Sequence, residues 1–389
     1  MRYGLNNVDY EERWYPERMR RERLERARQS MKNKGLDALL CFSPSNIRYI
    51  TGARGITLPA LHRHCLLIKN EDPLLFEFGG DIGRVQDNAP WLKDRIRVAI
   101  PPYLVTDEIA VQWAKDLKKM LREAGVEKMG LDSLSFRIEK ALQAAEIPFV
   151  DGNPAMGEAR MLKTRDELEC IKLSVSLGEL AYEAARNAIK PGVKEGEVQG
   201  EMIRVLAGQG CDWVRGICAA GEHTNPYWRI FGTDKVLARG DLVIIDRVHS
   251  LNGYACDYVR TFLCGDRATE GQKRAYRECH RQLYAAINMI KPGNTTAQVA
   301  EKLGEKEDYS EITIKYGHGM GLDAHEHPHI TFLSKKQPVT FKPNMVFAVE
   351  TYVPDEEDKQ GVRLEENLIV TEKGYEIISK YPFEEKLLD

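Results

Sequence analysis

The sequence predicts an α/β domain at the amino terminus, followed by an α+β domain that contains an internal pseudo-twofold duplication. Three observations predict this fold class. The chain has 389 residues, which is more than one ordinary hydrophobic core accommodates. Helix-like and strand-like segments alternate through its first part. A segment with the tripeptide Lys-Pro-Gly recurs in the second part, at Lys190 and again at Lys291.

The first predicted element is an arginine-rich helix. The segment PERMRRERLERARQSMKNKG carries six arginines between Arg18 and Arg28. Glutamates interleave with them, while Leu24, Ala27 and Met31 lie on one apolar stripe. This pattern favours a salt-bridged amphipathic helix over a helix that binds RNA.

The rest of the amino-terminal domain reads as alternating strands and helices. Strands are predicted at LDALLCF, HCLLIKN, PLLFEFGG, RIRVAI and KMGLD, and helices at EIAVQWAKDLKKMLREAG and SFRIEKALQAAE. The stretch DGNPAMGEARMLKT, which contains Pro154, predicts a linker. We therefore place the first domain at residues 1–157 and the second at residues 158–389, with a long helix beginning near Asp166.

The internal repeat suggests where a site would lie. AARNAIKPGVKEGEV and AAINMIKPGNTTAQV each place Lys-Pro-Gly after a helix with an Ala-Ala pair and just before another helix. Because two such matches occur in similar surroundings, we expect a duplicated helix-turn-helix-strand unit. A duplicated half-domain usually forms its site between the halves.

Composition narrows the class of protein. The net charge is −3, so no overall field attracts nucleic acid or an anionic membrane. No apolar run is long enough to span a bilayer, and the first residues lack the apolar core of a signal peptide. Eight cysteines occur without a CxxC pair. We therefore expect a cytoplasmic protein with reduced thiols and with no nucleic-acid or membrane partner.

Two aspartates lie in a predicted hairpin. GDLVIIDRVHSLNGYACDYVRTFLCG reads as two strands joined at Asn252-Gly253, a strong turn dipeptide. Asp246 ends an apolar run and Asp257 lies in the returning strand, so the carboxylates could converge. The alternative is structural, with Asp246 capping a turn and Asp257 paired with Arg260.

Further acidic residues occur in apolar strands. Glu350 lies within NMVFAVETYV, where an unpaired buried charge is costly. Glu365 and Glu366 precede another apolar strand and should point to opposite faces. Several inward carboxylates would repel one another unless multivalent ions neutralised them. With one imidazole from YGHGMGLDAHEHPHI, which holds four of the nine histidines, the donors suit two divalent ions.

The ordered donors resemble the metal-ligand signature of the pita-bread metalloenzymes, which include aminopeptidase P, prolidase, methionine aminopeptidase and the metal-free creatinase. GYACDYVRTF, GHGMGLDAHE and VRLEENLIVTEKG fit the flanks of that signature, and the likeness begins near Arg160. The resemblance implies a creatinase-like amino-terminal domain and a pita-bread catalytic domain. It also implies five metal ligands, namely Asp246, Asp257, His318, Glu350 and Glu365.

The same resemblance implies further roles. Glu350 would also transfer the proton of the attacking water, His325 would stabilise the oxyanion, and Arg363 would support the ligand two residues later. The cofactor would be two divalent ions, manganese first, with cobalt, iron or zinc as alternatives. Relatives imply a homodimer. His327 and His329 have no family role; they either line the pocket mouth with His325 or are solvated loop residues.

Two departures from the peptidase pattern bear on substrate. Peptidases of this kind commonly carry glycine two residues after the first ligand, where this chain has Val248, and a histidine where it has Arg229. TNPYW is similar to a stretch of the pita-bread lyases that cleave dimethylsulfoniopropionate, although those carry an aspartate at the position of Val248. We expect four residues to contact substrate: His223, Tyr227, Trp228 and His329.

The leading functional prediction is a dinuclear-metal hydrolase that cleaves a C–N bond of a small substrate, an Xaa-Pro peptide, by attack of a metal-bridged hydroxide. The alternatives are a lyase that cleaves the C–S bond of dimethylsulfoniopropionate, or an amidohydrolase acting on a compound such as ectoine or creatine. A binding protein with a dead site is the third class, and the complete ligand set argues against it.

Overall fold

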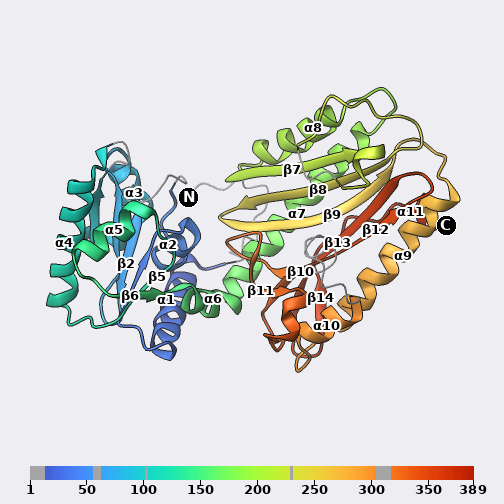
Figure 1. Cartoon of the computed structure of the whole chain (residues 1–389). Helices are drawn as coiled ribbons and strands as arrows, with labels where there is room; N and C mark the ends of the chain where they lie inside the picture. Colours follow the sequence, from blue (N-terminus) through green and yellow to red (C-terminus); the bar gives the residue numbers. More distant parts are fainter. Residues whose placement is uncertain (1–13, 56–62, 101–103, 228–230, 304–316) are drawn as a thin grey trace, which may run out of the picture. The chain divides into compact units, whose positions relative to one another are not determined.

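The computed structural model describes residues 14–55, 63–100, 104–227, 231–303 and 317–389. These residues form two compact units, one of residues 15–160 and the other of residues 161–389 together with Trp14. The division falls three residues after the boundary placed at residue 157 from the sequence. Each unit is built around sheets of its own (Figure 1).

The amino-terminal unit contains a six-stranded mixed sheet with the strand order β4-β3-β2-β1-β5-β6. Its strands are β1 Ala38–Cys41, β2 His64–Ile68, β3 Leu74–Phe78, β4 Ile96–Ala99, β5 Met129–Leu131 and β6 Phe149–Asp151. Its helices are α1 Pro16–Asn33, α2 Pro44–Thr51, α3 Ile82–Asn88, α4 Asp107–Glu123, α5 Phe136–Ala144 and α6 Asn153–Met161. The predicted α/β pattern is confirmed.

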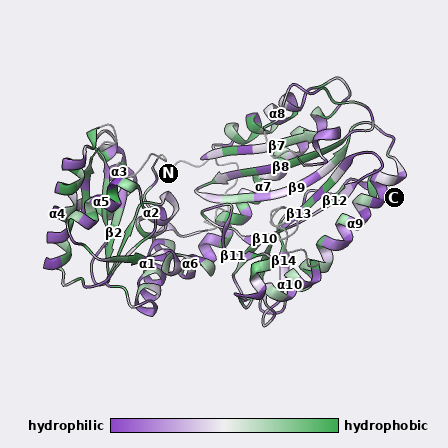
Figure 2. Cartoon of the chain, in the orientation of Figure 1, coloured by the Kyte–Doolittle hydropathy of each residue, from purple (hydrophilic) through white to green (hydrophobic). Residues whose placement is uncertain are grey.

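Amphipathic helices cover this sheet. Leu117 and Leu121 of α4 and Ile138 of α5 are buried in one apolar cluster with Leu40 and Leu66 of the sheet. In Figure 2 the strands of the sheet are predominantly green, whereas α4 and α5 show both purple and green. The burial of one face of each helix is the main stabilising contribution in this unit.

The arginine-rich segment forms α1, as predicted. Ala27 and Met31 are fully buried on its inner face, and Arg21 forms an exposed ion pair with Glu25 at 3.9 Å. Arg23 is buried, with its guanidinium 5.6 Å from the ring centre of Tyr49. Both arginines therefore make their contacts with residues of the amino-terminal unit.

The predicted linker around Pro154 is helical instead. It forms α6, which begins at Asn153 and has Pro154 in its first turn. Proline is tolerated there because the first amides of a helix have no intrahelical acceptor. Asp151 accepts a hydrogen bond from the amide of Asn153 at 2.9 Å and so helps the helix to start.

The carboxy-terminal unit consists of two copies of a helix-helix-hairpin arrangement. The first copy comprises α7 Arg165–Ala188, α8 Glu195–Gly208, β7 Trp213–Ala220, β8 Leu242–Leu251 and β9 Tyr254–Leu263. The second comprises α9 Glu270–Ile287, α10 Thr296–Leu303, β10 Gly317–Gly319, β11 Glu326–Ile330, β12 Val346–Asp355 and β13 Gln360–Val370. Strand β14 Tyr375–Ile377 and helix α11 Glu385–Leu388 follow. The sheets have the orders β7-β8-β9 and β11-β10-β12-β13-β14.

The two Lys-Pro-Gly turns adopt the same backbone conformation. Gly192 has φ +93° between α7 and α8, and Gly293 has φ +91° between α9 and α10. Residues with a side chain rarely adopt such angles, so glycine is required at both turns. This equivalence confirms the internal duplication predicted from the sequence.

Side chains join the two hairpins along β9 and β13. The Thr261 hydroxyl donates to the carbonyl of Arg363 at 2.7 Å and accepts from its amide at 3.1 Å. The Asn367 amide donates to the carbonyl of Asp257, and Arg260 donates to the carbonyl of Glu365 at 2.7 Å. These contacts fix one hairpin against the other.

Helix α7 packs behind the first hairpin around a buried arginine. The Arg247 guanidinium lies 4.9 Å from the ring centre of Tyr182 and 4.8 Å from that of Tyr258, and it donates to the Cys256 sulfur. Gly178 faces this guanidinium so closely that a Cβ at that position would overlap it. The packing thus depends on a glycine in the middle of a helix.

We predict that Gly178→Ala destabilises the protein by about 1–3 kcal/mol, because the added methyl group overpacks the Arg247 cavity. Gly200→Ala in α8 is the matched control, since a Cβ there meets nothing within 4 Å. Gly200→Ala should stabilise the protein by about 0.5–1 kcal/mol through helix propensity. Urea unfolding midpoints of the two variants measure this difference, and equal midpoints would contradict it.

Two features concern membrane-spanning helices and disulfide bonds. Among the described residues, no helix combines the length and the hydropathy that crossing a bilayer requires. All eight cysteines are free thiols, and seven of them are buried.

Candidate metal centre

The first hairpin brings two aspartates to one face. Asn252 and Gly253 have φ angles of +52° and +78°, which is the two-residue turn that the sequence predicted. Val248 pairs directly with Asp257, and Asp246 precedes Val248 by two residues on the same strand. Because strand positions two apart share a face, both carboxylates lie on the same side of the sheet.

The second hairpin places two glutamates directly opposite each other. Glu350 of β12 pairs with Glu365 of β13. Glu366 faces the other side, as the alternation predicted, and forms a buried ion pair with Arg260 at 3.0 Å. The alternative pairing of Asp257 with Arg260 is therefore wrong, because these residues are three positions apart on β9 and point to opposite faces.

One guanidinium connects the hairpins. Arg363 contacts Asp246 Oδ2 through Nη1 at 2.5 Å and Glu350 through Nη2. The sequence predicted that Arg363 would support Glu365, two residues later. Instead its two ion pairs are with Asp246 and Glu350. Side chains two apart on a strand run parallel, and that of Arg363 extends across the sheet face to the other strands.

His318 of β10 supplies a nitrogen beside these carboxylates. Its Nε2 lies 3.9 Å from Asp257 Oδ2 and 3.8 Å from Glu365 Oε1. The other ring nitrogen, Nδ1, lies 3.1 Å from the carbonyl of Gly319, which orients the ring. Burial lowers the pKa of His318 to about 4, so at neutral pH the ring is neutral, the form that binds metals.

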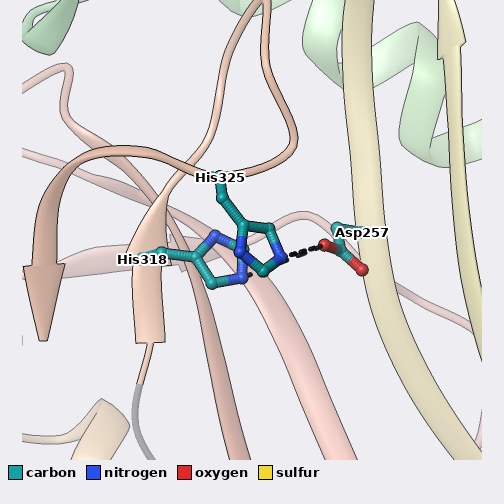
Figure 3. A group of neighbouring side chains, drawn as sticks. All are labelled: Asp257, His318 and His325. Carbon is teal, nitrogen blue, oxygen red and sulfur yellow. Dashed lines mark ion pairs between the residues drawn. The ribbon is translucent and has the colours of Figure 1, made fainter. Parts of the chain in front are cut away.

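His325 approaches the same aspartate from the loop between β10 and β11. Its Nε2 lies 3.3 Å from Asp257 Oδ2, and its ring stacks on that of His318 with 3.8 Å between centres (Figure 3). The His325 side chain is 61% exposed, in contrast with the buried His318. The hydrogen bond to Asp257 raises the pKa of His325. His325 is thus an accessible imidazole at the edge of the cluster.

The cluster carries more negative charge than the protein around it neutralises. Four buried carboxylates face one guanidinium and two imidazoles, of which His318 is neutral. Burial and the charges of Asp257 and Glu350 raise the pKa of Glu365 well above its ordinary value. Its Oε1 is buried and has no hydrogen-bond donor among the residues that the structure describes. An orphaned carboxylate oxygen among other oxygen donors and one imidazole fits divalent metal ions.

A cavity of about 450 Å³ opens onto this cluster. Its lining comprises Arg215, Gly216, Ile217, Phe231, Asp246, Val248, Asp257, His318, His325, Arg363 and Glu365. The volume suits a small molecule or a short peptide. Val248 and the β7 residues Arg215, Gly216 and Ile217 form the wall opposite the histidines. The sequence did not predict these β7 residues as part of a site, because no local motif marks them. Their pairing with β8 brings them to the cavity.

Of the four residues predicted to contact substrate, the three in the described part of the chain do not line the cavity. The Tyr227 hydroxyl donates to Asp246 Oδ2 at 2.9 Å, so Tyr227 supports a candidate ligand and does not line the cavity. His223 lies 2.9 Å from Glu195 Oε1, also outside the lining. His329 pairs with His318 in the β10–β11 ladder and lies outside the lining as well. Trp228 and Arg229 are outside the described residues.

Two family models match the chain. That of the creatinase/prolidase N-terminal domain matches residues 23–162. That of metallopeptidase family M24 matches residues 169–372, more than half of the chain and all the residues of the cluster. The chain belongs to metallopeptidase family M24. Its fold is therefore the pita-bread fold with a creatinase-like amino-terminal domain, as the sequence predicted.

Individual M24 relatives are distant but cover nearly the whole chain. An Xaa-Pro dipeptidase of Pyrococcus furiosus is 26% identical, over 92% of this chain and 98% of the relative. A dimethylsulfoniopropionate lyase of Roseovarius nubinhibens is 24% identical, over 96% and 88%. Among solved structures, an Xaa-Pro dipeptidase from Bacillus anthracis matches with a TM-score of 0.77 at 24% identity, over 94% of this chain and 98% of that one.

We predict that Glu365→Gln stabilises the metal-free M24 domain. The raised pKa of Glu365 means that folding penalises its ionised form above the pKa of the unfolded chain, and a neutral amide avoids this penalty. The melting temperature of the metal-free protein at pH 7.5 should rise by a few degrees. Added Mn²⁺ should raise the melting temperature of the wild type but not that of the variant.

Glu366→Gln is the matched control on the opposite face. It removes a partner from the buried Arg260 and should lower the melting temperature, while the response to Mn²⁺ persists. A fall in melting temperature for both variants would show that Glu365 is not under electrostatic strain.

Proposed function

We propose that this chain is a metal-dependent hydrolase that cleaves the Xaa-Pro bond of a short peptide. The observation that carries the proposal is the clustering of Asp246, Asp257, His318, Glu350 and Glu365, four of which line one cavity. Membership of family M24 and the similarity to Xaa-Pro dipeptidases support the same reaction.

The five donors would hold two divalent ions, for which we propose Mn²⁺, with Co²⁺, Fe²⁺ and Zn²⁺ as alternatives. When bound, such ions lower the pKa of water and polarise the scissile carbonyl. Asp257 and Glu365 are the donors nearest to His318 Nε2, at 3.9 Å and 3.8 Å. Asp246 and Glu350 are held in place by Arg363, so the guanidinium orients half of the carboxylates.

Two side chains would move or hold protons during the reaction. Glu350 accepts the proton of the attacking water and returns it to the leaving nitrogen. Arg363 holds the Glu350 carboxylate in place through the ion pair between them. His325 donates a hydrogen bond to the oxygen on which negative charge develops. Its exposure to the cavity and its raised pKa suit this role, since a proton-bearing imidazole can donate.

A lyase acting on dimethylsulfoniopropionate is the second candidate. It is favoured by TNPYW and by the similarity to the lyase of Roseovarius nubinhibens. Val248 argues against it, because those lyases carry an aspartate at this position and Val248 lines the cavity. We further propose a cytoplasmic protein, which the free cysteines support. The homodimer expected from the family resemblance stays a prediction.

We predict that the Mn²⁺-loaded protein hydrolyses L-alanyl-L-proline and that Asp257→Ala abolishes this activity, because Asp257 contacts both histidines of the cluster. The assay measures proline release, with EDTA-treated protein as a second negative control. Dimethylsulfoniopropionate is tested in parallel by release of dimethyl sulfide. Sulfide release without peptide cleavage would replace the hydrolase proposal by the lyase one.

We predict that His325→Ala lowers kcat for the same peptide by about 10²–10³-fold, as loss of one oxyanion donor does. The stoichiometry of bound Mn²⁺ should be unchanged. His327→Ala is the matched control, because His327 is exposed on β11 and does not line the cavity. A kcat within twofold of the wild type for His325→Ala would exclude His325 from the reaction.

A further inference from the structure

Arg215 of β7 lies at the wall of the cavity that is farthest along the sheet from the aspartate Asp257. The strand register pairs Arg215 with Val248, and Val248 with Asp257. Directly paired residues project to the same face, so the three side chains form one row across β7, β8 and β9. Adjacent strands are about 4.8 Å apart, which puts the Arg215 and Asp257 backbones roughly 10 Å from each other. The row has a cation at one end and a candidate metal ligand at the other.

The Arg215 guanidinium has no hydrogen-bond or ion-pair partner among the described residues, although the side chain lines the cavity. The other arginine of the cavity, Arg363, is committed to Asp246 and Glu350. Val248 stands between Arg215 and the acidic cluster and offers no charge to either. An aspartate at that position would lie opposite Arg215 and pair with it. Because the residue is valine, the guanidinium remains available to a ligand.

The wall between the two ends is apolar. Val248 and Ile217 line it from neighbouring strands, and Phe231 lines the cavity as well. A ligand that fits therefore has a polar reacting group at the cluster, an apolar body and an anionic group beyond it. A dipeptide with a carboxy-terminal proline has this sequence of groups: the scissile carbonyl, the pyrrolidine ring and the terminal carboxylate. Arginine is the side chain best suited to a carboxylate, because it can donate two parallel hydrogen bonds.

We propose that Arg215 is a specificity-determining residue that binds the substrate carboxylate and restricts the enzyme to dipeptides. This inference rests on the proposed Xaa-Pro hydrolysis and adds the length and the charge of the substrate to it. A tripeptide with the scissile bond at the cluster places its carboxylate one residue too far along and leaves Arg215 facing an uncharged peptide group.

The test compares L-alanyl-L-proline with its carboxy-terminal amide in the Mn²⁺-loaded enzyme. The wild type should prefer the acid by about 10- to 100-fold in kcat/KM, the range of a charge-assisted hydrogen bond. Arg215→Ala should lose this preference by losing activity on the acid, with activity on the amide within twofold of the wild type. Arg215→Lys should recover part of the preference, since it keeps the charge but not the two-pronged geometry.

Arg204→Ala in α8 is the matched control, because Arg204 is exposed, pairs with Glu201 and does not line the cavity. It should leave both substrates unaffected. Equal cleavage of acid and amide by the wild type would overturn the inference while leaving Xaa-Pro hydrolysis intact. A parallel loss on acid and amide in Arg215→Ala would also overturn it, because that result indicates a structural role.

A binding measurement separates the inference from the proposed reaction. Titration calorimetry compares L-proline with L-prolinamide on the wild type and on Arg215→Ala, in metal-loaded and in metal-free protein. L-Proline should bind the wild type at least tenfold more tightly than it binds the variant, whether or not peptide is cleaved. If neither peptide is hydrolysed but this difference is found, the proposed reaction fails and the carboxylate subsite stands. Equal binding of L-proline to both proteins overturns the subsite.

Discussion

The burial of four carboxylates in one cluster between two sheets is the constraint on which the carboxy-terminal domain depends. Each would be hydrated in water, and their mutual repulsion grows when water is removed. Arg363 offsets part of this cost by pairing with Asp246 and Glu350. Asp257 and Glu365 approach imidazoles, and Oε1 of Glu365 is buried with no hydrogen-bond partner in the described part of the chain. Binding of a cation at this cluster would therefore stabilise the fold of the domain.

The duplicated fold brings the four carboxylates together. Each half contributes a long hairpin with two acidic residues, and the hairpins meet along β9 and β13. On the reverse face, Glu366 forms an ion pair with Arg260, and Arg247 lies between two tyrosine rings. The carboxylates on the cavity face lack such complete partners, and a cation bound there would supply them.

Much of the cluster could be predicted from the sequence because its signals are local. Asn252-Gly253 marked the hairpin, and carboxylates in apolar strands marked Glu350 and Glu365 as unusual. The partners of Arg363 could not be predicted, because they depend on which strands lie beside β13. The helix α6 was missed because proline and glycine in its sequence are typical of linkers, whereas proline in a first turn also starts helices.

The difference between local sequence signals and contacts set by neighbouring strands also makes the reaction easier to infer than the substrate. The candidate ligand set is constrained by charge, so few residue types are tolerated at these positions. The substrate end of the cavity is built by β7, an edge strand that carries none of the candidate ligands. Arg215 on β7 and the neighbouring Val248 on β8 need only match the shape and charge of the bound ligand. We therefore expect the candidate ligands on β8, β9, β10, β12 and β13 to set the reaction, and residues of the cavity wall such as Arg215 to set the choice of substrate.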